Sequence, residues 1–275
     1  MSTPNARLAV LIDADNTSPK HAAALFDELA TYGVATVKRA YGDWTTPQLG
    51  GWKTALNQHA IVPKQQFAYT TGKNSTDSAL IIDAMDLLYT GNVDGFALVS
   101  SDSDFTGLAT RLRESGKTVY GLGLKKTPAS LVAAVDRFIY LEVLGADRAA
   151  EAGDPGAAGD DGGDPGEGDA PLPNLQSLLT RAINATSGDD GAVSVSAIGN
   201  YLRSASASFD PRLYGSPKLS TLLQAQPYLT VTGSGSAMQV SLKSRAPAAK
   251  APAKKAATKR SAAQKSTTKK AQASG

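Results

Sequence analysis

Short apolar runs alternate, in the first half of the chain, with segments whose apolar residues recur at helical spacing. The runs with the length and bulk of buried strands are residues 8–12, 34–40, 61–67, 96–99 and 117–122. The segments that place apolar side chains three and four residues apart are 19–32, 52–59, 76–88 and 105–112. A last helix and strand extend to about residue 144. This alternation predicts an α/β domain with a mainly parallel sheet covered by helices on both faces.

A second, smaller module is predicted in the last third of the chain. Its expected helices and hairpin cover residues 175–183, 196–204, 217–223 and 228–241. The segments on either side of it, rich in Gly, Asp and Pro or in Ala, Lys, Pro and Thr, cannot bury a core. We therefore divide the chain into four parts: an α/β domain at 1–148, an acidic disordered linker at 149–171, a winged helix at 172–243 and a basic disordered tail at 244–275.

Charge is strongly segregated, although the net charge is only +3. Residues 151–169 hold seven acidic and no basic residues, whereas residues 243–275 hold ten Lys or Arg and no acidic residue. The tail therefore offers cations that can follow phosphates. The lack of cysteine excludes disulfides and thiolate chemistry. Neither a signal peptide nor an apolar run near the ~20 residues of a membrane span is visible. We expect a cytoplasmic protein without a membrane partner.

Aspartates stand where predicted strands end and helices begin. Asp13 follows the first strand, and Asp102 and Asp104 follow the fourth. Asp77 lies in the first turn of the preceding helix. In a doubly wound sheet the first and fourth strands can be neighbours at the switch point, where a crevice opens. One alternative is that Asp104 only caps the helix that follows it.

Four carboxylates in one crevice would repel each other, by about 4 kcal/mol per pair at ~4 Å and an effective dielectric of ~20. A bound cation would relieve this repulsion. All-oxygen ligands without cysteine or a histidine cluster favour Mg²⁺ or Mn²⁺ over zinc. Such a site suits phosphate-ester chemistry. We expect Asp15, Asp83 and Ser100 to lie next to the ligands.

Three segments together resemble the NYN domain, the LabA-like branch of the PIN-like nuclease superfamily. They are Leu-Ile-Asp13-Ala-Asp-Asn16, Lys73-x-x-x-Asp77 with Asp83 six residues on, and Ser-Ser-Asp102-Ser-Asp104-Phe105. The resemblance covers roughly residues 6–145 and implies a Rossmann-like PIN fold and metal-dependent RNA cleavage. It also implies that Asn16 and Ser101 orient water or phosphate, and that the catalytic metal ligands are Asp13, Asp77, Asp102 and Asp104.

Residues 172–243 resemble the OST-HTH/LOTUS domain, a winged helix that often accompanies NYN domains. The matching segments are Asp190-Gly191, Ile198-Gly199-x-Tyr-Leu202, Phe209-Asp-Pro211 and Tyr214-Gly-Ser-Pro-Lys218. The resemblance implies binding of RNA or of a partner protein. The basic residues of the module before Lys243 are only Arg181, Arg203, Arg212 and Lys218. We therefore expect the module to select partners more than to add raw affinity for RNA.

Two other functions fit parts of the pattern. Asp13-Ala-Asp15-Asn-Thr17 fits the nucleophile loop of a haloacid-dehalogenase-type phosphatase, with Ser100 as its second-strand serine. That family needs a later acidic pair, which residues 121–128 lack. A non-catalytic RNA-binding adaptor could instead read phosphates through Lys38, Arg39, Lys73, Lys125 and Lys126.

The two histidines, His21 and His59, lie outside the motifs. A histidine acid–base pair acting on the RNA 2′-hydroxyl is therefore not expected. Hydrolysis should leave a 5′-phosphate and a 3′-hydroxyl.

Overall fold

The structure is a computed structural model that describes residues 5–67, 75–144, 172–188 and 191–243. The predicted linker and tail and the candidate residue Lys73 lie outside these ranges. Within them, an α/β domain contains a sheet in the order β3-β2-β1-β4-β5-β6, in which every neighbouring pair is parallel. The strands are β1 (Arg7–Asp13), β2 (Val34–Gly42), β3 (Val62–Gln65), β4 (Gly95–Val99), β5 (Thr118–Gly123) and β6 (Arg137–Tyr140). The predicted α/β class is confirmed.

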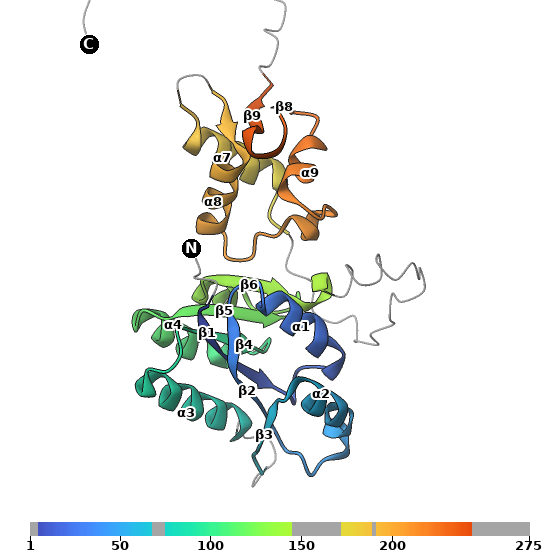
Figure 1. The fold of residues 1–275 in the computed structure, drawn as a ribbon, viewed down its shortest axis with the longest axis vertical. Coiled ribbons are helices and arrows are strands. Elements are labelled where there is room, and N and C mark those ends of the chain that lie inside the picture. The colour runs from blue at the N-terminus through green and yellow to red at the C-terminus, as the bar shows by residue number, and fades with distance from the viewer. Residues whose placement is uncertain (1–4, 68–74, 145–171, 189–190, 244–275) are drawn as a thin grey trace, which may run out of the picture. The chain divides into compact units, whose positions relative to one another are not determined.

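Helices cover both faces of this sheet (Figure 1). On one face lie α1 (Ala22–Leu29) and α2 (Trp52–His59), and on the other α3 (Ser75–Thr90), α4 (Thr106–Glu114) and α5 (Ala129–Ala134). Short 3₁₀ helices precede three of them: η1 (Pro19–His21), η2 (Pro47–Gly51) and η3 (Ser103–Phe105).

The central strand β1 is buried on both faces, which explains its unbroken apolar sequence. Leu8, Val10 and Ile12 pack in the core beneath α1 and α2. Ala9 and Leu11, which alternate with them, pack in the core beneath α3, α4 and α5. One strand therefore anchors both cores, and its carboxyl end is held in a fixed position.

The order in which strands are added to the sheet changes direction between β1 and β4. From β1 the chain continues outward to β2 and β3, and from β4 it continues outward on the other side to β5 and β6. These strands are parallel neighbours, and Ile12 pairs with Val99 at their carboxyl ends. The predicted neighbourhood of the first and fourth strands is thus confirmed. Because ligand sites of open α/β sheets lie at such switch points, Asp13 and the residues after Val99 stand at the expected position.

The second module packs three helices beside a small antiparallel sheet. Its helices are α7 (Leu175–Thr186), α8 (Val195–Ala205) and α9 (Leu219–Gln224), with the 3₁₀ turns η4 (Pro211–Tyr214) and η5 (Gly235–Ala237). Its strands, in the order β7-β9-β8, are β7 (Val193–Ser194), β8 (Leu229–Thr232) and β9 (Gln239–Leu242). The predicted helices and hairpin are confirmed, whereas β7 was not predicted.

Side-chain caps fix where two of these helices begin. The Asn174 side chain accepts a hydrogen bond from the Ser177 backbone N–H at 2.9 Å, and Ser194 Oγ accepts one from the Ala197 N–H at 3.2 Å. The module has its own apolar core, in which Leu179, Ile198 and Val240 are fully buried. Within the described residues, no helix combines the length and the apolar character needed to cross a bilayer.

The strand β5 approaches β6 closely at Gly121. A Cβ added there would lie 2.6 Å from Phe138 Cδ2 and 3.3 Å from Val135 Cγ1. We predict that Gly121→Ala lowers the free energy of unfolding by about 1–3 kcal/mol, because the Phe138 ring has to move. Urea unfolding of the full chain measures this. Gly107→Ala in α4 is the control, since its Cβ would meet nothing within 4 Å. Equal stability of the two variants would contradict this packing.

Candidate metal centre

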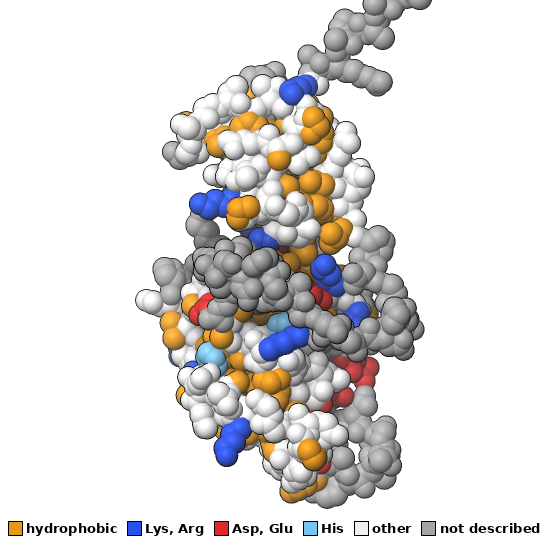
Figure 2. Space-filling view, turned by 90° about the vertical axis from the view of Figure 1, so that its right-hand side faces the viewer, with side chains coloured by type: hydrophobic (Ala, Val, Ile, Leu, Met, Phe, Trp, Pro, Cys, Tyr) orange, Lys and Arg blue, Asp and Glu red, His pale blue; other side chains and the backbone are white. Residues whose placement is uncertain are grey.

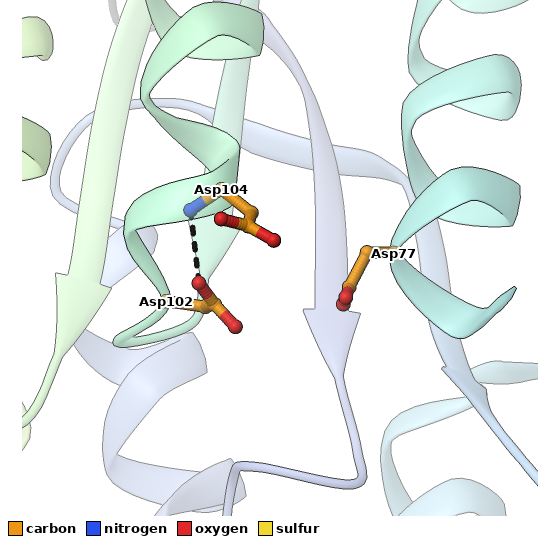
Figure 3. Close-up of side chains that lie close together, drawn as sticks. All are labelled: Asp77, Asp102 and Asp104. Atoms are coloured by element: carbon orange, nitrogen blue, oxygen red, sulfur yellow. Dashed lines mark hydrogen bonds between the residues drawn. The ribbon is translucent and has the colours of Figure 1, made fainter. Parts of the chain in front are cut away.

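Three carboxylates converge at the carboxyl edge of the sheet. Asp77 extends from the first turn of α3, while Asp102 and Asp104 come from the turn after β4, and the three side chains face one another (Figure 3). One carboxylate oxygen from each lies within 4.8 Å of those of the other two. The ligand set is all oxygen, as Mg²⁺ and Mn²⁺ prefer.

The turn that carries two of these groups is set by local hydrogen bonding. Asp102 occupies the N-cap of η3, and its Oδ1 accepts a 2.9 Å hydrogen bond from the Asp104 backbone N–H. Asp104 follows in the first turn and is exposed. The alternative that Asp104 only caps the helix is therefore wrong, because Asp102 is the N-cap of η3 and Phe105 is the N-cap of α4. Asp102 still has a second oxygen that can bind a ligand.

Asp13 joins the two loops of the site, which follow β1 and β4, through side-chain hydrogen bonds. Its side chain is fully buried and accepts hydrogen bonds from Asn16 Nδ2 at 3.0 Å and Ser100 Oγ at 2.8 Å. Ser100 Oγ in turn accepts a 3.1 Å bond from the Asp102 N–H. Burial raises the pKa of Asp13, while the bonds from Asn16 and Ser100 oppose this. The geometry makes Asp13 a positioning residue, and its expected role as a metal ligand stays a prediction.

The electrostatics of the site disfavour a full set of negative charges. Burial, followed by the charges of Asp13, Asp102 and Asp104, raises the pKa of Asp77 to about 6. The Asp77 side chain is only 9% exposed, so water screens this repulsion poorly. A divalent cation among the three carboxylates would remove the cause of the repulsion. The residues present therefore fit such an ion.

Two of the three predicted neighbours of the ligands, Ser100 and Asp15, lie in the loops that form the site. Ser100 lies at the centre, and Asp15 links the β1 loop to α3 by accepting a 2.8 Å hydrogen bond from Thr76 Oγ1. Ser101 lies at the same edge, where its Oγ accepts a 2.8 Å bond from the Leu124 N–H.

Asp83 makes contacts with β2 and β3, and its place next to the ligands stays a prediction. Asp83 forms ion pairs with Arg39 and Lys64, and the Tyr41 hydroxyl donates to it at 2.5 Å. Although burial raises the pKa of Asp83, the hydrogen bonds from Tyr41 and Arg39 lower it below its usual range. The same contact occupies Arg39, which therefore does not provide a free cation for the crevice.

The remaining predicted cations have mixed outcomes. Lys125 and Lys126 lie in the turn after β5, at the same edge of the sheet as the carboxylates, and Lys126 is exposed. Lys38 donates to the His59 carbonyl oxygen and so lies against the end of α2.

Three residues make contacts that the sequence alone did not indicate. Thr76, near the start of α3, bonds Asp15 through its hydroxyl. His21, which lies outside the motifs, lines a cavity together with Asp15 and Asn16. Trp52, which lines the same cavity, was read only as part of a helix. A hydroxyl next to the motif residue Asp77 was the one signal that could have identified Thr76.

The fold and this acidic centre define an α/β domain of the PIN-like nuclease superfamily. The family model of the NYN domain matches residues 7–142, and that of the OST-HTH/LOTUS domain matches residues 170–241. The chain contains an NYN domain followed by a C-terminal OST-HTH/LOTUS domain, as predicted. Domains of the latter kind bind RNA and sometimes proteins.

Comparison with solved structures shows a likeness in fold. The crystal structure of a protein of unknown function from Vibrio parahaemolyticus RIMD 2210633 is similar with a TM-score of 0.43 and 20% identity. The match covers 51% of this chain and 95% of that chain. Among curated proteins, none matches this chain.

The repulsion at Asp77 leads to a prediction for the metal-free protein. In the folded state the pKa of Asp77 is about 6, above its usual value of 3.8. The folded state therefore binds more protons than the unfolded one between these values, and stability falls as the pH rises through this window. Asp77→Asn should raise the free energy of unfolding by about 1–3 kcal/mol at pH 7.5 and by about half as much at pH 5, which lies inside this window.

Thermal unfolding in a metal chelator at both pH values tests this expectation. Asp86→Asn is the matched control, because Asp86 is exposed on the same helix. Mn²⁺ should raise the melting temperature of the parent and leave that of Asp77→Asn nearly unchanged. A loss of stability in Asp77→Asn at pH 7.5 without metal would contradict the repulsion.

Proposed function

We propose that this protein is a metal-dependent ribonuclease that hydrolyses RNA phosphodiesters. The observation that carries the proposal is the convergence of Asp77, Asp102 and Asp104 at the β1/β4 switch point of a domain from a nuclease superfamily. Mg²⁺ or Mn²⁺ is the proposed cofactor, and a cytoplasmic location is part of the proposal.

The three carboxylates would hold the metal, with Asp13 setting the position of the loops beneath them. Once bound, such an ion activates water and stabilises charge on phosphoryl oxygens. Asp102 presents its second oxygen to the centre while its first remains fixed by the Asp104 N–H. Lys125 and Lys126 stand where they could attract the phosphates on either side of the scissile bond. Asn16 and Ser101 are proposed to orient water or phosphate.

The burial of Asp13 argues against the phosphatase alternative. A nucleophilic aspartate has to reach the phosphorus atom of its substrate, whereas the Asp13 side chain is 0% exposed and hydrogen-bonded to Asn16 and Ser100. That alternative also assigns no role to the carboxylates of Asp77 and Asp104. The adaptor alternative needs no metal, so metal binding separates it from the nuclease.

The OST-HTH/LOTUS domain is proposed to select RNA or a partner protein. Arg212, one of its few cations, donates to Asp210 at 2.8 Å, so its charge is largely compensated. On the face shown in Figure 2, the Lys and Arg side chains of the described residues stand singly and do not merge into a basic band. Bulk affinity for RNA is therefore assigned to the basic residues that follow Leu242.

The first prediction concerns the metal. Asp102→Asn removes one ligand charge with little change in volume, so the fold should persist. Mn²⁺ affinity, measured by calorimetry, should fall by about 100-fold or more, since even residues that only support metal ligands account for 10–100-fold. Cleavage of mixed RNAs should be lost, and the parent's products should carry 5′-phosphates.

Asp86→Asn is again the control and should behave as the parent. If Asp102→Asn cleaves RNA in Mn²⁺ as fast as the parent, the assignment of the site fails. If neither protein binds Mn²⁺ but both bind RNA, the adaptor is the correct reading.

A second prediction concerns the basic residues 243–275. Removing them takes away ten Lys or Arg. If about six contact a single strand, the log–log salt slope of RNA binding should flatten by about 4, from ~0.7 per phosphate contact. Fluorescence anisotropy between low and moderate salt measures this slope. Arg181→Gln with Arg203→Gln in the full chain is the control and should change the slope by less than about 1.4. If the two Arg substitutions changed the salt slope more than the truncation did, the affinity would be assigned to the winged helix.

A further inference from the structure

A cavity of about 490 Å³ opens beside the metal centre, on the α1/α2 side of the sheet. It shares residues with the two loops that hold the carboxylates, because Asp15, Asn16 and Ser101 line it. These residues are close neighbours in sequence of Asp13 and Asp102. A strand whose phosphate lies at the carboxylates could therefore place an adjacent group in this cavity.

The lining of the cavity selects the chemistry of that group. It includes neither Lys nor Arg, and it contains the carboxylate of Asp15, so it disfavours a phosphate. Its apolar wall includes Leu49, Trp52 and Leu141, which are at most 6% exposed. Hydroxyl and amide groups stand beside this apolar wall. Such a combination suits a flat, neutral heterocycle with polar atoms at its edge.

Trp52 supplies an independent indication that this site takes a ligand. Its side chain is 2% exposed, and its indole Nε1–H is buried without a hydrogen-bond partner among the described residues. A buried N–H that lacks an acceptor costs about 1–3 kcal/mol. Most such groups in proteins are paired. The other tryptophan, Trp44, follows this rule, since its Nε1 donates to the Lys64 carbonyl oxygen at 3.0 Å.

We propose that this cavity seats one nucleobase of the RNA strand, next to the phosphate held at the metal centre, and that seating the base moves the lining enough for an acceptor on the base edge to receive the buried Trp52 N–H. The inference rests on the proposed function in taking RNA as the ligand. It adds the position at which the protein reads a base. The apolar wall would contact the face of the base, and Asp15 would keep the phosphates outside.

The test uses the two tryptophans as matched partners. In Trp44→Phe, Trp52 is the sole tryptophan, because the chain contains two, and excitation at the red edge of the indole absorption avoids the tyrosines. Adding a uridine pentanucleotide in a metal chelator should quench or shift its emission. In Trp52→Phe, which keeps Trp44, the emission should not respond. This readout needs no metal and no cleavage. The base site can therefore be confirmed when the nuclease assignment fails, and it can fail when the nuclease assignment is confirmed.

Affinity provides the second measurement. Trp52→Phe keeps an aromatic ring but removes the donor, so the pentanucleotide should bind about five- to tenfold more weakly. An abasic ribose at one position of the pentanucleotide should cost the parent a similar factor and cost Trp52→Phe much less. Free uridine should quench Trp52 only at far higher concentration than the strand, because its base arrives without neighbouring phosphates.

Trp52→Phe changes a core residue, so a second variant should block the cavity without changing the core. Ser18 lines the cavity and is exposed, and its side chain makes no capping hydrogen bond. Ser18→Phe should therefore fill the cavity, retain the parent's melting temperature and lose the quenching of Trp52. If Trp52 emission ignores the strand and both variants bind it as the parent does, the cavity seats no base. In that case the indole N–H is merely an unsatisfied group or is paired with water.

Discussion

Acidic side chains gathered at the carboxyl ends of β1 and β4 repel each other, and the structure has to accommodate this repulsion. The protein does so by giving each carboxylate a different environment. Asp13 is buried but receives two side-chain hydrogen bonds, and Asp102 has one oxygen fixed as a helix cap. Asp77 is mostly buried among like charges, and burial and these charges together raise its pKa. The strands beneath supply the rigidity this needs, because both are buried on each face.

This arrangement separates the two sides of the same edge by their chemistry. The carboxylates face the side of α3 and α4, where charge on a phosphate can be met by a cation. The cavity lies on the side of α1 and α2, where apolar and uncharged polar groups prevail. The β1 loop borders both, since Asn16 bonds Asp13 and also lines the cavity. A single-stranded polymer with alternating charged and aromatic parts matches this division.

Much of this could be predicted from the sequence, because the relevant signals are local. Unbroken apolar runs identified β1 and β4, and the aspartates that follow them fixed the edge at which the site lies. Asp83 contacts β2 and β3 for a geometric reason. Six residues along a helix amount to a rotation of about 120° away from Asp77, which turns Asp83 toward the cations of β2 and β3. The two-residue strand β7 is too short to leave a pattern.

Other features depend on contacts between distant segments and leave no sequence signal. Ser18 stands at the N-cap position of η1, yet its side chain makes no capping bond. The Thr76 hydroxyl reaches Asp15 across the fold. The cavity is formed by segments from five parts of the domain, and Trp52 could not be assigned to it before those segments were placed together.

The different roles of the aspartates bear on how such a domain can diverge. Asp13 is part of the architecture, because its buried hydrogen bonds join the loops after β1 and β4. Asp77 and Asp104 contribute charge to the centre, and the packed core does not depend on them. A descendant chain could therefore lose the acidic triad and keep its fold, provided that it retained Asp13. Among relatives, an intact first-strand aspartate would then mark common ancestry, and only the complete triad would mark retained chemistry.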